Sequence, residues 1–218
     1  MKEILFFEHK LILHNSGILF WPKNDLAVVS DLHLEKSSYF AKKGNFLPPY
    51  ESFDTLKNLN LTLKNIKVKN LIFLGDVFHD FKGFERLDLN TKMIFEDLMK
   101  KFNTKFIIGN HDENIVIPNV KIFKNFKVEN INFIHRLTES NSIEISGHYH
   151  PKYTLKINGN KISQNCFVVC NKKIILPAFG KFTGGLDVKH TSLSQILKGF
   201  RDYYLINDKK IYHIPGKG

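Results

Sequence analysis

The stretch Leu71-Ile72-Phe73-Leu74-Gly75-Asp76 is a strand-length apolar run that stops at a glycine and a carboxylate. Two other apolar runs stop in a similar way: Leu26–Ser30 before Asp31-Leu32-His33, and Lys105–Ile108 before Gly109-Asn110-His111-Asp112. Short apolar runs with such ends are typical of buried strands. Because ligands bind at the carboxyl ends of strands in open α/β sheets, we expect the three polar clusters to meet at one edge.

Helical patterns separate these three strands. The segment Glu51–Ile66 carries apolar residues at helical spacing, and a second helix is expected over Leu89–Phe102. The order strand, helix, strand, helix, strand predicts a parallel α/β layer.

The rest of the chain is richer in strands. An Asn15-Ser16-Gly17 turn between Leu11–His14 and Ile18–Trp21 predicts a hairpin near the start. Further strands, one helix and a last hairpin are expected over Val120–Phe123, Asn132–Ile134, Ile143–Ser146, Thr154–Ile157, Asn165–Val169, Lys173–Leu176, Ser192–Phe200 (helix, capped by Thr191 or Ser192), Tyr203–Ile206 and Lys210–Ile214. Helices early and strands late predict an α/β fold of two facing mixed sheets with helices outside, in a single domain over 1–218.

Composition limits the function less than it limits the fold. The net charge of +11 favours polyanionic partners only mildly, since nearly all the basic residues are lysines and only three are arginines. Cys166 and Cys170, the only cysteines, are expected to be buried and reduced. With no apolar run of membrane-spanning length and no secretion-signal pattern, we expect no membrane association and a cytoplasmic protein.

Two more strands end in histidine. His135 follows Ile131–Ile134, and Gly147-His148-Tyr149-His150 follows Ile143–Ser146. Carboxylate, imidazole and amide groups without thiolate suit Mn²⁺, Fe or Zn²⁺. Two ions about 3.5–4 Å apart need a bridging carboxylate, and Asp76 beside Gly75 is the expected bridge.

The motifs D-x-H, G-D-x-x-H, G-N-H-D, a lone histidine and G-H-x-H, in this order, resemble the calcineurin-like metallophosphoesterases. The resemblance implies a four-layer αββα sandwich and two divalent ions, Mn²⁺ foremost. It assigns Asp31, His33, Asp76 and His150 to one ion and Asp76, Asn110, His135 and His148 to the other. It also implies that His111 is a catalytic histidine without a metal, oriented by Asp112.

A closer resemblance covers most of the chain. DLHLEKSSYFAKKGNFLPPYESFDTL, LGDVFHD, SGHYHP and LPAFGKFTGGLDV resemble the DNA ligase-associated metallophosphoesterases. That family implies a metal-dependent phosphodiesterase, a role in DNA repair, and a DNA ligase and a helicase as partners.

Other residues near the motifs have open roles. His79 and Asp80 are candidates for orienting the metal ligands, or for a surface turn. Arg136 and Lys181 are substrate-binding candidates, with a solvated side chain as the alternative. Lys36, Lys42 and Lys43 either follow a nucleic-acid backbone or form a solvated face.

Three functions fit these features. The first is attack of a metal-bridging hydroxide on a nucleic-acid or nucleotide phosphodiester, with His111 assisting the leaving group. The second is hydrolysis of a small soluble phosphate ester, and the third is a non-catalytic, metal-stabilised scaffold in a repair complex.

Overall fold

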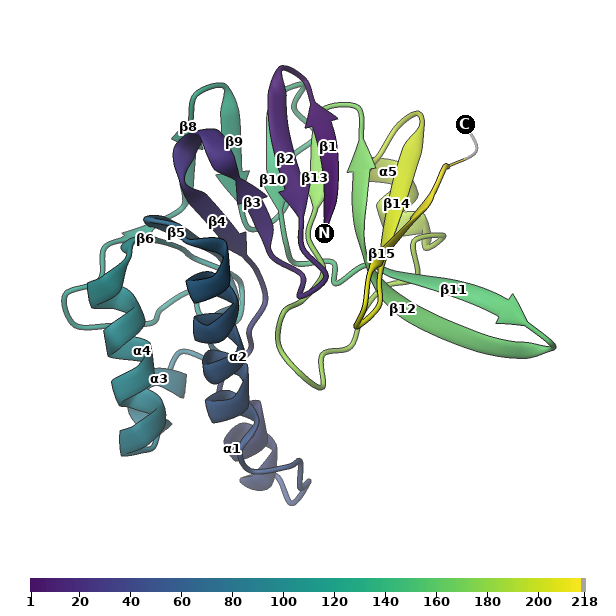
Figure 1. Ribbon diagram of the computed structural model, residues 1–218. Helices are drawn as coiled ribbons and strands as arrows, with labels where there is room; N and C mark the ends of the chain where they lie inside the picture. Colours follow the sequence, from purple (N-terminus) through teal and green to yellow (C-terminus); the bar gives the residue numbers. More distant parts are fainter. Residues whose placement is uncertain (217–218) are drawn as a thin grey trace.

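Two sheets lie face to face in the computed structural model, which describes residues 1–216 (Figure 1). The first sheet has the order β1-β2-β3-β4-β5-β6-β7, and the second β15-β14-β12-β13-β10-β9-β8 with β11 paired to β12. Strands of the first sheet are β1 (Lys2–Phe6), β2 (His9–Leu13), β3 (Leu19–Trp21), β4 (Leu26–Val29), β5 (Asn70–Leu74), β6 (Asn103–Ile107) and β7 (Ile122–Phe123). Strands of the second are β8 (Asn125–Val128), β9 (Ile131–Ile134), β10 (Ile143–Ser146), β11 (Lys152–Ile157), β12 (Asn160–Cys170), β13 (Lys173–Ile175), β14 (Arg201–Ile206) and β15 (Ile211–Ile214).

Helices cover the outer faces of both sheets. The helices are η1 (Pro22–Asn24), α1 (Lys36–Ala41), α2 (Glu51–Ile66), α3 (Gly83–Arg86), α4 (Leu89–Lys101) and α5 (Thr191–Ile196). In Figure 1, α2 and α4 lie beside the first sheet, and α5 lies behind β14 of the second. The α/β architecture predicted from the sequence, two mixed sheets between helices, is confirmed.

Three apolar clusters hold the layers together. One joins the first sheet to α2 and α4, through side chains such as Phe73, Leu59 and Phe95. A second fills the space between the sheets, where Trp21 and Phe167 are fully buried. The third joins the second sheet to α5. Burying large apolar side chains on both faces of each sheet is the main favourable term for such a fold.

The parallel strands are neighbours within each sheet. In the first, β4, β5 and β6 are parallel, as the alternation of strands and helices predicted, and the edge strand β7 continues them. In the second, β9, β10 and β13 are parallel neighbours. The carboxyl ends of β4, β5, β6, β9 and β10 therefore lie at one rim of the sandwich.

Several elements depart from the sequence-based expectation. The strand β8 and the short helices α1 and α3 were not predicted, because none is long enough to show a period. The strand β12 starts at Asn160 and not at Asn165. Helix α5 is shorter than predicted, and its cap is His190, whose ring accepts the Ser192 N–H.

Two further expectations concern cysteines and membranes. Cys166 and Cys170 are buried free thiols, as predicted. Among the helices within residues 1–216, none has the length and apolar character needed to cross a membrane.

Candidate metal centre

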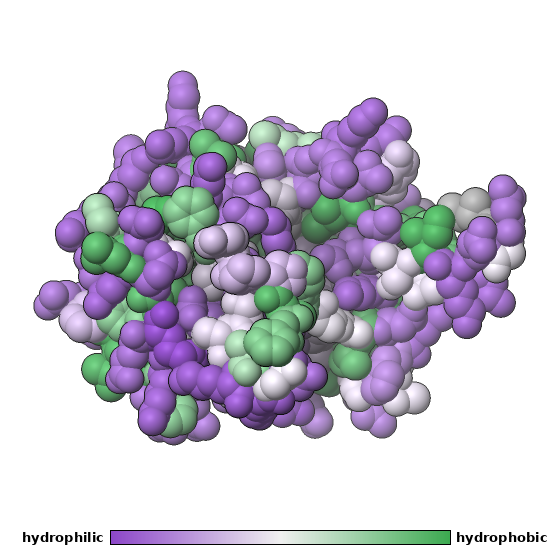
Figure 2. All heavy atoms as spheres, turned by 90° about the horizontal axis from the view of Figure 1, so that it is seen from below, coloured by the Kyte–Doolittle hydropathy of each residue, from purple (hydrophilic) through white to green (hydrophobic). Residues whose placement is uncertain are grey.

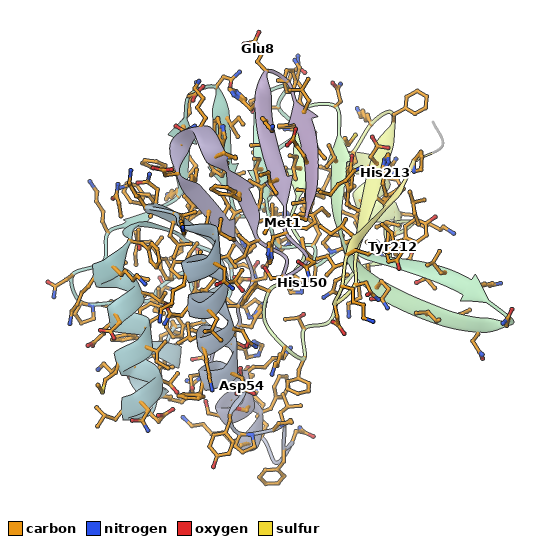
Figure 3. All side chains as sticks on the ribbon, in the orientation of Figure 1. Met1, Glu8, Asp54, His150, Tyr212 and His213 are labelled. Atoms are coloured by element: carbon orange, nitrogen blue, oxygen red, sulfur yellow. The ribbon has the colours of Figure 1, made fainter. Side chains whose placement is uncertain are left out.

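The polar residues that follow five strands converge on the rim between the two sheets. β4 leads to Asp31 and His33, β5 to Asp76, β6 to Asn110, β9 to His135, and β10 to His148 and His150. Figure 3 shows His150 at this rim, in the middle of the molecule, below the strands of both sheets. The sheet order alone brings these residues together, although they span more than half of the sequence.

The backbone at this rim is unusual. Asp31, His33, Asp76, His148 and His150 all have positive φ angles, between 43° and 71°. Non-glycine residues in the left-handed region are uncommon, and strained conformations of this kind gather at active sites. These left-handed residues lie in the turns after β4, β5 and β10, where the five side chains gather.

The first group consists of Asp31, His33 and His150. His150 Nε2 lies 3.2 Å from Asp31 Oδ1 and 3.2 Å from His33 Nε2. Asp31 is fully buried. The neighbouring Ser30 donates to its Oδ2 at 2.6 Å, and the His148 N–H donates to both of its oxygens. Sequence reasoning did not single out Ser30, although a hydroxyl at the end of an apolar strand was the available signal.

The second group consists of Asp76, His135 and His148, with Asn110 beside it. His135 Nε2 lies 3.3 Å from Asp76 Oδ2, 3.2 Å from Asn110 Oδ1 and 3.2 Å from His148 Nδ1. The opposite ring nitrogen of His135 is 2.9 Å from the Leu74 carbonyl. Donation to that carbonyl places one ring proton on Nδ1, so that Nε2 is the nitrogen that faces the group.

One oxygen of Asp76 faces both groups. Its Oδ2 is 3.3 Å from His135 Nε2 and 3.9 Å from His33 Nε2. Its Oδ1 accepts the His111 N–H at 2.9 Å, which holds the carboxylate in place. This position, between a histidine of each group, is the one required of a carboxylate that bridges two cations.

The spacing of these atoms suits divalent cations. Nitrogen or oxygen atoms about 2.0–2.1 Å from a cation lie about 2.8–3.4 Å from one another at octahedral or tetrahedral angles. The two groups have contacts of 3.2–3.3 Å between atoms that are mostly acceptors. A cation in each group would satisfy these converging lone pairs, so the residues fit a pair of metal ions.

Electrostatics favours the same occupants. Burial opposes ionisation of Asp31 and Asp76, but hydrogen bonds and nearby histidines hold the pKa of each carboxyl below its usual range. Burial lowers the pKa of His33 to about 3 and that of His148 to about 4, so both rings are neutral at pH 7. Burial would also lower the pKa of His135, yet the hydrogen bond and charge of Asp76 raise it to about 9. The site thus attracts positive charge.

His111 lies beside the metal groups and is exposed to solvent. Its Nδ1 donates to the His79 carbonyl at 3.0 Å, and its ring stacks on that of His79 with centroids 5.0 Å apart. His79 also contacts His33, with 3.4 Å between their Nδ1 atoms. His79 therefore contacts both His33 and His111, two of the predicted site residues.

The Asp112 carboxylate bonds to backbone N–H groups and not to the His111 ring, which the resemblance implied it would orient. Its carboxylate accepts backbone N–H groups from Gly109 at 2.7 Å, Val77 at 2.8 Å and Phe78 at 3.4 Å. Burial raises the pKa of Asp112 to about 6. The physical reason for the difference is local: the buried side chain points back under the loop, where it ties the turn after β6 to the turn after β5.

The remaining substrate candidates take different positions. Asp80 forms an ion pair with Arg86, and the Arg86 guanidinium also donates to Ser38. This ion pair therefore links α3 to α1, and the Asp80 carboxylate is directed to Arg86 and not to a metal-ligand candidate. Lys181 pairs with the exposed Asp54 of α2 at 3.1 Å (Asp54 is labelled in Figure 3). Arg136 is exposed, and its charge helps to lower the pKa of His148.

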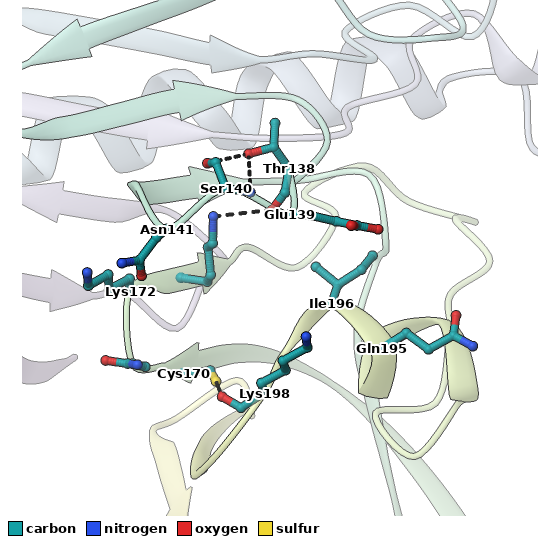
Figure 4. A pocket seen from close by; sticks show the side chains of 11 residues that line it. Thr138, Glu139, Ser140, Asn141, Cys170, Lys172, Gln195, Ile196 and Lys198 are labelled. Atoms are coloured by element: carbon teal, nitrogen blue, oxygen red, sulfur yellow. Dashed lines mark hydrogen bonds between the residues drawn. The ribbon is translucent and has the colours of Figure 1, made fainter.

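A separate pocket of about 290 Å³ lies near the other end of β10, and none of the predicted site residues lines it (Figure 4). Next to it, the buried Glu144 accepts from Lys173 at 2.7 Å and from the hydroxyls of Thr138, Ser140 and Ser142. This network satisfies the carboxylate internally, which is the arrangement of a structural ion pair.

Comparison with known families agrees with this geometry. Residues 25–208 match the family described as calcineurin-like phosphoesterase. The chain belongs to the calcineurin-like phosphoesterase family. Members of this family are metal-dependent hydrolases of phosphate esters, and the two groups of histidine and aspartate described above are the candidate metal sites of this member.

Solved structures give a second comparison. The crystal structure of Pseudomonas putida nuclease MPE has a TM-score of 0.75 and 23% identity, over 98% of this chain and 99% of that one. A conserved uncharacterized protein and predicted phosphoesterase from Streptococcus pneumoniae has a TM-score of 0.36 and 10% identity, over 87% of this chain and 96% of that one. The first shows that the calcineurin-like fold is shared along nearly the whole chain. No curated protein matches the sequence.

Proposed function

We propose that this chain is a two-metal phosphodiesterase that cleaves the phosphodiester backbone of nucleic acids, with residues 1–218 acting as one domain. The observation that carries the proposal is the position of Asp76 Oδ2, 3.3 Å from a histidine of one group and 3.9 Å from a histidine of the other. Asp31, His33, Asp76 and His150 would hold one ion, and Asp76, Asn110, His135 and His148 the other.

When bound, the two cations would supply an activated water and neutralise the charge that develops on the phosphoryl oxygens. The mixed oxygen and nitrogen donor set accommodates Mn²⁺, Fe or Zn²⁺, and the motif resemblance puts Mn²⁺ first. The chain itself keeps the carboxylates ionised and the rings of His33 and His148 neutral, and it directs Nε2 of His135 into the site by bonding its Nδ1 to the Leu74 carbonyl.

His111 is the proposed proton donor to the leaving oxygen. Its Nδ1 proton is committed to the His79 carbonyl, so a second proton must sit on Nε2, the free ring nitrogen. A histidine in that state can donate to a phosphoryl or leaving oxygen within hydrogen-bonding distance. The stack on His79 keeps the ring in one orientation during the transfer.

Two observations support a nucleic-acid diester as the substrate. The net charge of +11 favours polyanions. The structural relative from Pseudomonas putida, which shares the fold, is a nuclease. The motif resemblance to the DNA ligase-associated subgroup extends the proposal to a cytoplasmic role in DNA repair, with a DNA ligase and a helicase as partners.

The test is substrate preference. Purified protein with Mn²⁺ is assayed on a small chromogenic diester, the matching monoester and end-labelled DNA. Cleavage of the diester and of DNA supports the proposal. Turnover of the monoester alone would replace it with a phosphatase acting on a small soluble metabolite. No turnover of any of the three by metal-loaded protein would favour a non-catalytic scaffold.

A further inference from the structure

A two-stranded arm projects from the second sheet next to the metal centre. It consists of residues 152–165, where β11 pairs antiparallel with the first half of β12, whereas the second half of β12 pairs with β13 and β14 inside the sheet. In Figure 1 the arm extends away from both sheets at the lower right. A two-stranded ribbon gains little stability by itself, so a projection of this kind calls for a functional explanation.

The tip of the arm is a tight β-turn. Asn158 and Gly159 have φ angles of 50° and 81°. Two central residues with positive φ form the type I′ turn, which matches the twist of antiparallel strands and favours Asn-Gly. The register is therefore well defined along the whole arm.

That register gives the arm one polar and basic face. Side chains alternate along each strand. The cross-strand pairs on this face are Lys152↔Asn165, Thr154↔Ser163 and Lys156↔Lys161. On the other face, Tyr153 and Leu155 pack partly against the apolar cluster beneath β14. The arm thus directs three lysines and three neutral polar residues to one side.

The pair at the outer end is the most informative. Lys156 and Lys161 are both exposed and lie directly opposite each other. Like charges in this position destabilise a hairpin. The arm residues 152–165 contain no aspartate or glutamate, and Asp187, which hydrogen-bonds Thr154, lies at the base of the arm. An external anion between the two ammonium groups would remove the repulsion.

The base of the basic face joins the metal centre. Lys152 follows His150 by two residues, and its Nζ donates to the Thr183 carbonyl at 3.2 Å. The same loop contacts the other metal-binding segment, since the Gly180 N–H donates to the Asp31 carbonyl at 3.1 Å. A pocket of about 460 Å³ opens here, and Lys152, Asn165 and Lys181 contribute to its lining.

The arm can therefore follow a charged chain that leaves the site. Lys152 and Lys156 are four residues apart on one strand, which is about 13 Å at about 3.3 Å per residue. One strand of a nucleic-acid duplex rises about 3.4 Å per phosphate, so the basic face spans several phosphates. Figure 2, which views the molecule from below, shows mainly hydrophilic residues over the projection at the right.

We propose that the basic face of this arm binds the phosphate backbone of a nucleic-acid strand on one side of the scissile bond. The inference rests on the proposed phosphodiesterase function and adds the surface that would distinguish a long substrate from a small one. Lys156 and Lys161 contact phosphates outside the metal centre. Lys152 and Asn165 guide the chain between the arm and the centre.

The test compares two double variants that each remove two exposed lysines. Lys156→Ala with Lys161→Ala changes the arm, and Lys100→Ala with Lys101→Ala changes the last turn of α4, on the opposite side of the molecule (Figure 1). Binding of a fluorescent single-stranded DNA is measured without metal over a range of salt concentrations. Turnover of a small chromogenic diester is measured separately with Mn²⁺.

The arm variant is expected to bind DNA about tenfold more weakly, and its salt slope should fall by about 1.4, or about 0.7 for each lost phosphate contact. The α4 variant should retain the wild-type slope, and both should cleave the small diester normally. Equal losses in the two variants, or none in the arm variant, would overturn the inference. If the wild type forms a dimer that the arm variant does not form, and DNA binding is unchanged, the inference is overturned. The partner of the arm would then be a second copy of the chain.

Failure of the proposed function gives a different result. If the wild-type protein does not hydrolyse the small diester, the phosphodiesterase proposal is contradicted. The metal-free binding measurement would still test the arm. Failure of wild-type protein to bind the strand would overturn the arm's role and leave diester hydrolysis standing.

Discussion

Replacing Asp76 with asparagine tests the proposed two-metal centre most directly. The Asp76 carboxylate is buried, and its Oδ2 faces His135 at 3.3 Å and His33 at 3.9 Å. Asparagine has nearly the same shape, and its oxygen can still accept the His111 N–H that Asp76 Oδ1 accepts at 2.9 Å. The loop should therefore keep its conformation while the bridging charge is lost.

The magnitude follows from the buried charge. Removing one partner of a buried ionic interaction costs about 3–5 kcal/mol, which corresponds to roughly 10²–10⁴ in binding or rate. Because the amide nitrogen has no lone pair to offer a cation, we expect Asp76→Asn to lose at least one of two ions. Turnover of the small diester should fall about 10²–10⁴-fold.

The assay combines metal analysis after dialysis against Mn²⁺ with diester turnover, and thermal unfolding of the metal-free protein checks the fold. Asp54→Asn is the matched control, because Asp54 is exposed on α2 and pairs only at the surface with Lys181. Two ions per chain and near-normal turnover in Asp76→Asn would refute the bridging role. A metal-free protein that no longer folds would instead assign Asp76 a structural role.

Three further predictions use other parts of the structure. His111→Ala should lower diester turnover by about 10²–10⁴ while metal content stays unchanged; lost metal would make His111 a ligand instead. Gly75→Ala places a Cβ 2.2 Å from His135 Nδ1, so the His135 ring must move. A displacement of about 1 Å should lower diester turnover about 10²-fold, and unaltered kinetics would contradict this expectation. Lys173→Met leaves Glu144 buried without its partner, and chemical unfolding should show a loss of about 3–5 kcal/mol with small-diester turnover maintained. Because its partners hold the pKa of Glu144 below the usual 4.5, their stabilisation is present above pH 4.5 and lost as pH falls further, so the variant's deficit should shrink in acid.

The sequence was sufficient for the parts of this protein that depend on local pattern. Apolar residues at helical spacing predicted the helix Glu51–Ile66 with the bounds that α2 has. Apolar runs that stop at polar clusters predicted β4, β5 and β6, and the rule for strand ends predicted that Asp31, Asp76 and Asn110 would meet. The same rule extended to the histidines after β9 and β10. These inferences succeed because burial imposes a period on the sequence, and because parallel strands share an edge.

Some local signals were present but were not used. Asn158-Gly159 is a strong hairpin signal, and it marks the tip of the arm between β11 and β12. The arm was missed because its residues 160–164 are largely polar and have no apolar alternation on which to base a strand. Helices α1 and α3 are too short for a helical period to appear.

Only the tertiary structure decided which atoms meet. Asp112 follows His111 directly, yet its carboxylate binds backbone of the neighbouring loop, and the His79 carbonyl orients His111 instead. Asp80 follows His79, yet it pairs with Arg86. Partners of this kind depend on side-chain direction and on loops that come close only after both sheets have packed. The sequence by itself therefore determined which residues gather at the rim, because alternation and strand order are local properties. The folded chain decided which of them lie in one group, which hydrogen-bond to the others, and where a basic arm stands beside them, because these depend on contacts between segments distant in sequence.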